Sequence, residues 1–148
     1  MTVADALHGV TRLFLDTAPV IYFVENNPTF RSRLDEVFGL IDAGSLMAVT
    51  SAVTLAEAMI HPIRLGLVPL QRDFAALIVH GENTVFVALG EREATRAAEL
   101  RARYNLSLTD AFQVACALEA GCDAPLTNDL GLNRVTELQV IVLDALDV

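Results

Sequence analysis

Short apolar runs bounded by turn residues alternate along the chain with longer stretches in which apolar residues recur every three or four positions. The short runs predict buried strands of a parallel sheet, and the longer stretches predict helices. Five strands are expected, at residues 12–16, 46–50, 83–88, 124–127 and 138–143. Helices are expected between them, at residues 18–25, 28–43, 51–60, 69–79, 91–104 and 108–120.

Two of these helices have opposite surface characters. The helix at residues 28–43 has one apolar side and one polar side, and the polar side carries Arg31 and Arg33, so it is predicted to lie on the surface. The helix at residues 108–120 is apolar nearly all round and is predicted to be buried. Strands that alternate with helices predict an open α/β sheet with right-handed crossovers.

Length and hydropathy narrow the class of protein. A chain of 148 residues suits one domain, residues 1–148, with a sizeable core. The hydrophobic content of 53% and mean hydropathy of +0.46 are high, but the longest uncharged apolar run, residues 18–24, is far shorter than a membrane span. The start of the chain lacks the features of a secretory signal. We therefore expect a cytoplasmic protein with no membrane contact.

Charge and residue usage exclude several kinds of site. The net charge of −9 argues against a generally basic nucleic-acid-binding surface. All ten basic residues are arginines, which excludes both a phosphate-binding loop ending in Gly-Lys-Ser/Thr and Schiff-base chemistry. Cys116 and Cys122 have neither Cys-x-x-Cys spacing nor a neighbouring histidine, so we expect buried, unreactive thiols.

Four carboxylates occur where the predicted elements begin or end. Asp16 ends the first strand, Glu57 lies in the helix after the second, Asp110 lies in the first turn of the buried helix, and Asp129 follows the fourth strand. Ligands of open α/β sheets bind beyond the carboxyl ends of the strands, so the four are expected to converge there. Their mutual repulsion would favour a cation. A site with only oxygen ligands suits Mg²⁺ or Mn²⁺ better than zinc.

Each carboxylate also has a simpler structural interpretation. Asp16 could cap the following helix, and Asp129 could cap a turn. Asp110 lies three residues after Ser107, as in a capping box. Glu57 could face solvent, as most helical glutamates do. The metal-site hypothesis therefore depends on the four residues together.

Three segments resemble the PIN domain, a family of metal-dependent nucleases. They are FLDTAPVIYF (14–23), SAVTLAEAM (51–59) and LSLTDAFQVACALEAGCDAPLTND (106–129). The resemblance covers nearly the whole chain and implies a five-stranded parallel sheet in the order 3-2-1-4-5, flanked by helices. Many members have Phe three residues after the last aspartate, where this chain has Leu132.

The resemblance also implies roles for particular residues. Asp16, Glu57, Asp110 and Asp129 would form the catalytic, metal-binding quartet. The hydroxyls of Thr17 and Thr127 would support it. The cofactor implied is Mg²⁺ or Mn²⁺.

The short chain looks most like the VapC-type toxins of bacterial toxin-antitoxin pairs. This resemblance implies an endoribonuclease that homodimerises and is silenced by an antitoxin. Phosphates of the RNA substrate could be met by arginines. The candidates are Arg31, Arg33, Arg101 and Arg103.

Other functions stay open on the sequence alone. A PIN domain could process RNA without an antitoxin, cleave structured DNA, or act as a non-catalytic scaffold. Receiver domains and haloacid-dehalogenase-type phosphatases have a similar layout, but both families use a lysine in the site, and this chain has no lysine.

Overall fold

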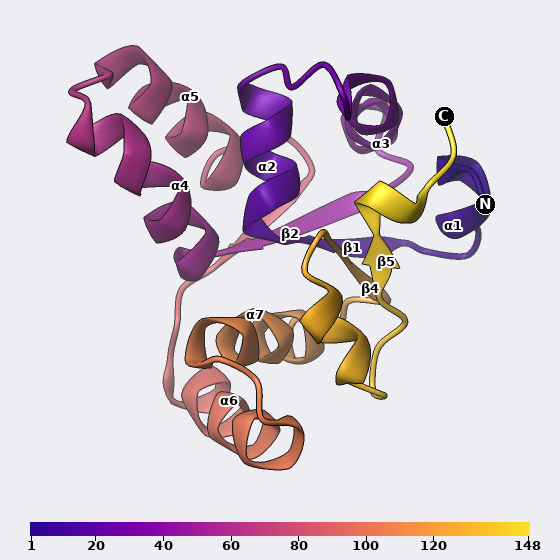
Figure 1. Cartoon of the computed structure of the whole chain (residues 1–148), viewed down its shortest axis with the longest axis vertical. Helices are drawn as coiled ribbons and strands as arrows, with labels where there is room; N and C mark the ends of the chain where they lie inside the picture. Colours follow the sequence, from indigo (N-terminus) through magenta and orange to yellow (C-terminus); the bar gives the residue numbers. More distant parts are fainter.

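Five parallel strands form one sheet in the order β3-β2-β1-β4-β5 (Figure 1). The computed structural model describes residues 1–148. The strands are β1 (Arg12–Leu15), β2 (Met47–Ser51), β3 (Thr84–Val87), β4 (Ala124–Thr127) and β5 (Ile141–Val142). This arrangement confirms the predicted α/β class and the strand order that the resemblance implied.

Helices cover both faces of the sheet. The longer helices are α2 (Thr17–Val24), α3 (Arg31–Asp42), α4 (Ala52–Arg64), α5 (Val68–Ile78), α6 (Glu91–Tyr104) and α7 (Leu108–Glu119). Figure 1 shows α2 to α5 on one side of the sheet and α6 and α7 on the other. Three short helices complete the chain: α1 (Val3–Ala6), η1 (Leu130–Arg134) and η2 (Leu143–Ala145). None of the helices combines the length and apolar character of a membrane span.

The central strand β1 is covered by helices on both faces, which explains why its core residues are all apolar. Leu13 and Leu15 belong to the large core cluster beneath α2 and α3. Phe14 points to the other face, where it packs with Cys116 of α7. A strand covered by helices on both faces has no polar side, so it is recognised by an apolar run and not by alternation. The prediction that Cys116 is buried is confirmed.

Three predicted elements differ most from their bounds in the structure. Helix α3 begins at Arg31, although we expected it to begin at residue 28. Helix α4 continues to Arg64 through Pro62, although we expected it to end at residue 60. Proline removes only its own backbone donor, and the last turn of α4 keeps bonds such as that from the Leu65 N–H to the His61 carbonyl at 3.2 Å. The predicted strand 138–143 pairs with β4 only at Ile141 and Val142, because it is an edge strand beside a four-residue neighbour.

Arg33 lies in a different environment from the predicted one. Its side chain belongs to the side of α3 that was expected to face solvent, yet the residue is only 8% exposed. The guanidinium donates hydrogen bonds to the carbonyls of Leu143 and Leu146, each at 3.1 Å, and to that of Thr29 at 3.0 Å. The prediction that Arg33 could meet RNA was wrong, because the C-terminal segment passes over α3.

Candidate functional site

The four predicted carboxylates line a single pocket of about 350 Å³. Asp16 directly follows β1, and Asp129 comes two residues after β4. Glu57 reaches the pocket from α4, and Asp110 reaches it from the first turn of α7. Thr17, Tyr22 and Asn128 are among the other lining residues. The structure therefore brings together all four acids at the carboxyl edge of the sheet.

Asp16 is held by side chains from two distant elements. It is 8% exposed, and although it precedes α2, its carboxylate makes no capping hydrogen bond. Thr127 Oγ1 donates to Asp16 Oδ2 at 2.7 Å, and Gln113 Nε2 donates to Asp16 Oδ1 at 3.1 Å. The simple capping interpretation of Asp16 was therefore wrong, since both oxygens of the carboxylate are used inside the site.

Gln113 joins Asp16 to a buried polar network. Its Nε2 also donates to Thr54 Oγ1 at 2.8 Å, and its Oε1 accepts from Ser51 Oγ at 2.5 Å. Sequence reasoning missed this residue, which is 2% exposed. The available signal was a glutamine in a helix that is otherwise apolar, because a buried amide requires hydrogen-bond partners.

Asp110 and Asp129 form an acidic pair. Burial raises the pKa of Asp110 to about 7, with further contributions from a hydrogen bond to Asp129 and from the charges of Asp129 and Asp16. The bond from Ser107 opposes this shift in the pKa of Asp110. Like charges at close range favour retention of a proton. Burial and the neighbouring carboxylates therefore together favour the protonated form of Asp110.

Capping interactions are present beside this acidic pair. Ser107 Oγ accepts from the Asp110 backbone N–H at 3.2 Å and so caps α7. Asp129 Oδ1 accepts from the Gly131 N–H at 2.8 Å. The capping interpretation of Asp129 is thus confirmed. It does not exclude a second role, because Asp129 also lines the pocket.

Glu57 occupies the exposed side of the pocket. Its Oε1 accepts a hydrogen bond from Thr17 Oγ1 at 2.6 Å. Because Thr17 begins α2 directly after Asp16, this contact ties the exposed glutamate to the buried aspartate. The expected solvent exposure of Glu57 is confirmed, and so is its position at the pocket.

The pocket has the donor chemistry of a hard-cation site. Its polar lining is made of carboxylates, hydroxyls and the side chain of Asn128, with no arginine or histidine. Such oxygen donors fit Mg²⁺ or Mn²⁺. No three Asp, Glu, His or Cys side chains lie in a ready-made ligand arrangement, so side-chain rotation would have to accompany binding of a shared ion. Cys116 and Cys122 do not contribute, and burial raises the pKa of each thiol to about 12.

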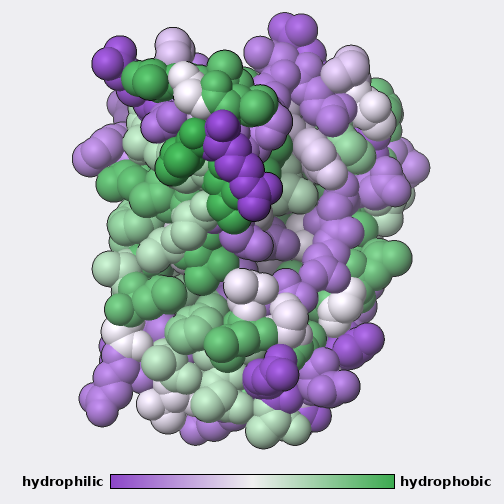
Figure 2. Space-filling model, turned by 60° about the vertical axis from the view of Figure 1, so that its left-hand side comes forward, coloured by the Kyte–Doolittle hydropathy of each residue, from purple (hydrophilic) through white to green (hydrophobic).

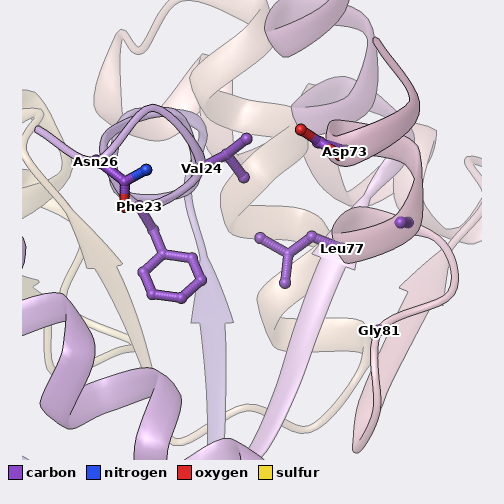
Figure 3. Close-up of a pocket in the computed structure, with 7 residues that line it drawn as sticks. Phe23, Val24, Asn26, Asp73, Leu77 and Gly81 are labelled. Atoms are coloured by element: carbon purple, nitrogen blue, oxygen red, sulfur yellow. The ribbon is translucent and has the colours of Figure 1, made fainter. Parts of the chain in front are cut away.

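A larger groove of about 450 Å³ lies between α2 and α5. Figure 3 shows Phe23 and Leu77 projecting into it from the two helices. Asp73 is its one titratable lining residue, so the groove has no group of residues suited to catalysis. Figure 2 views the molecule from this side and shows hydrophobic residues grouped over much of one half of the face.

The chain belongs to the PIN domain family. Its sequence matches the PIN domain profile over residues 13–138, which includes all four pocket carboxylates. No curated protein matches the chain.

Several solved structures have the same fold. A DNA-bound VapBC complex from Salmonella typhimurium is 19% identical, with a TM-score of 0.67 over 90% of this chain and 98% of that chain. VapBC2 from Rickettsia felis, bound to a promoter DNA fragment, is 15% identical, with a TM-score of 0.63 over 89% and 98%. VapC20 of Mycobacterium tuberculosis, a toxin that cleaves the sarcin-ricin loop, is 16% identical, with a TM-score of 0.63 over 76% and 86%. At these identities the likeness shows a shared fold.

Proposed function

We propose that the protein is a Mg²⁺- or Mn²⁺-dependent endoribonuclease. The observation that carries this proposal is the gathering of Asp16, Glu57, Asp110 and Asp129 at one pocket that no basic side chain lines. Repelling carboxylates cost stability unless a cation or a proton compensates them. In a nuclease, a bound divalent cation would compensate this repulsion between the four carboxylates.

The proposed ligand roles divide the four acids. Asp16, Asp110 and Glu57 would hold one ion, directly or through water, and Asp129 would complete a second or weaker site. A divalent cation held by these residues would supply an activated water and would offset the charge that develops on the phosphate. No side-chain nucleophile is then required.

The chain's own residues orient these ligands. Thr127 donates to Asp16 and also accepts from the Asp129 N–H at 2.8 Å, so one hydroxyl contacts both acids. Thr17 fixes Glu57 in the same way at the exposed side. These contacts support the proposed role of both threonines as residues that position the carboxylates.

We further propose that the protein is the toxin of a toxin-antitoxin pair. Structures with this fold include VapBC complexes and a toxin-antitoxin complex from Klebsiella pneumoniae, which has a TM-score of 0.65. The net charge of −9 favours a partner with basic residues. An arginine of such a partner could reach the pocket carboxylates bidentately and compete with metal. Co-purification with a small basic protein would support this partner.

We also propose that the chain is a single PIN domain, that the protein is cytoplasmic and that it forms a homodimer. Exposed apolar side chains at the end of the α4 and α5 pair support self-association, because burial of apolar groups away from water lowers the free energy. They are Ile60, Ile63, Leu65, Leu67 and Val68. The molar mass in solution, from light scattering on a sizing column, tests this part of the proposal.

RNA cleavage by the purified protein tests the activity. Total RNA, transfer RNA and a ribosomal sarcin-ricin loop oligonucleotide are incubated with and without Mn²⁺. The native chain should cut at least one of them only when Mn²⁺ is present, and Asp16→Asn should abolish cleavage while leaving the circular dichroism spectrum unchanged.

Asp123→Asn is the matched control. Asp123 precedes β4 and accepts hydrogen bonds from Thr11 and Arg12 at the opposite edge of the sheet, so its loss perturbs a strand end without reaching the pocket. Full cleavage by Asp16→Asn would reject the catalytic assignment. Absence of cleavage by the native chain, with intact partner binding, would favour a non-catalytic scaffold. If the native chain cleaves RNA but has no antitoxin partner, a role in RNA processing would be favoured.

A further inference from the structure

Gln113 uses every hydrogen-bonding group of its side chain within the site. A glutamine amide has two N–H donors and one carbonyl acceptor. The two donors go to Asp16 Oδ1 and Thr54 Oγ1, at 3.1 and 2.8 Å, and the carbonyl accepts from Ser51 Oγ. With 2% exposure, the amide exchanges none of these partners for water easily. Its position is therefore fixed from three places in the fold: Asp16 at the start of α2, Ser51 at the end of β2, and Thr54 in α4.

The neighbours also determine which end of the amide faces Asp16. Ser51 Oγ already accepts from the Thr54 N–H at 3.2 Å, which leaves its own proton to donate to Gln113. Thr54 Oγ1 donates to the Leu15 carbonyl at 3.3 Å and so can accept from Gln113. A reversed amide would place its oxygen against the carboxylate. The N–H end must face Asp16.

A neutral donor has a particular effect on a carboxylate. An arginine or lysine at this position would hold Asp16 but would also cancel its charge, which would weaken attraction for a cation. The amide orients the carboxylate and leaves its charge intact. Two side-chain donors occupy two of the roughly four acceptor directions of Asp16, so others stay free toward the pocket.

We propose that Gln113 is a positioning residue that holds Asp16 ready to bind the divalent cation of the site. This inference rests on the proposed metal-dependent function. Loss of a residue that orients a metal ligand commonly weakens metal affinity by 10- to 100-fold.

Calorimetric titration with MnCl₂, in the absence of RNA, tests this role. Gln113→Met keeps the side-chain length and removes the donors, and it should raise the dissociation constant for Mn²⁺ about tenfold. Gln71→Met is the control for the same substitution elsewhere, because Gln71 donates from Nε2 only to the Pro62 carbonyl, at 3.2 Å, and lies outside the pocket. It should bind Mn²⁺ like the native chain.

A second variant keeps the test valid if Gln113→Met does not fold. Ser51→Ala leaves Gln113 in place but removes the donor that fixes the amide orientation. It should weaken Mn²⁺ binding, by less than the roughly tenfold effect of Gln113→Met. Native affinity in whichever of these two variants folds would overturn the role of Gln113 alone. No Mn²⁺ binding by the native chain would overturn the proposed function and this inference together.

Discussion

Thr127 and Asp16 are 111 positions apart in the chain, and the hydroxyl of Thr127 donates to Asp16 Oδ2 at 2.7 Å. Thr127 ends β4 and Asp16 directly follows β1, and these neighbouring parallel strands are paired at Leu15 and Leu126. The pairing of two strands thus sets the position of a carboxylate that we propose as a metal ligand. Each contact of this kind can be removed without deleting an acid.

Thr127→Val should reduce both stability and Mn²⁺-dependent cleavage. The isosteric change leaves Asp16 Oδ2 and the Asp129 N–H without their partner, at a cost of about 1–3 kcal/mol in the free energy of unfolding. Thr50→Val is the matched control, since Thr50 is equally buried and donates to the Ile78 carbonyl, away from the pocket. Urea unfolding and cleavage rates are measured for both. Equal losses of activity in the two variants would contradict a role for Thr127 in the site.

Asp110→Asn should stabilise the protein above about pH 7. The folded-state pKa of Asp110 is raised to about 7, above the ordinary value near 3.9 in an unfolded chain. A raised carboxyl pKa means that the folded state binds the proton more tightly, so native stability falls as the pH rises from about 4 to about 7. Asparagine carries no charge and removes this loss.

Thermal unfolding in EDTA from pH 4 to pH 8 measures the effect. The melting temperature of Asp110→Asn relative to the native chain should increase across this interval and then level off. Asp42→Asn, at an exposed position of α3, should show no such increase. A difference between Asp110→Asn and the native chain that does not change with pH would contradict the raised pKa.

Mn²⁺ should raise the melting temperature of the native chain. A ligand that binds only the folded state adds about 2.7 kcal/mol of stability at a hundred times its dissociation constant. For a chain of this size, that corresponds to several degrees. The shift should disappear in Asp16→Asn, and samples with EDTA and no added Mn²⁺ give the baseline. An equal shift in Asp16→Asn would place the bound ion elsewhere.

Arg33→Met should destabilise the fold without changing the site. It keeps the buried stem but leaves the carbonyls of Thr29, Leu143 and Leu146 without their charged donor, at a cost on the order of 3 kcal/mol. Arg31→Met, on the exposed side of the same helix, should change stability by less than about 0.5 kcal/mol. Chemical unfolding compares the two. Unchanged stability of Arg33→Met would show that the C-terminal segment does not depend on this arginine.

The elements that sequence analysis predicted best are those whose surroundings are uniform. Strand β4 and helix α6 have the expected bounds, because one is buried on both faces and the other has a regular apolar stripe. The end of α4 and the length of β5 were predicted less well. In both, the bounds depend on neighbours: the bonds that remain around Pro62, and the few residues of β4 available for pairing.

The candidate site shows the same division. Asp16, Glu57, Asp110 and Asp129 were found because carboxylates at the ends of strands and the starts of helices stand out in an apolar sequence, and sheet topology places those ends together. Gln113 and the altered pKa of Asp110 were not found. The partners of a buried amide and the burial of a carboxyl depend on which side chains meet across the sheet.

The sequence by itself determined the order of strands and helices, the apolar layers and the type of oxygen donor at the pocket, because periodicity and residue chemistry are local properties. Only the tertiary structure decided that Arg33 holds the C-terminal segment and that Asp16 is bonded to Gln113 and Thr127 in place of capping α2. It also decided that burial beside Asp129 raises the pKa of Asp110. These outcomes depend on distances between residues that are far apart in the chain. Those distances are fixed only when the helices pack on both faces of the sheet.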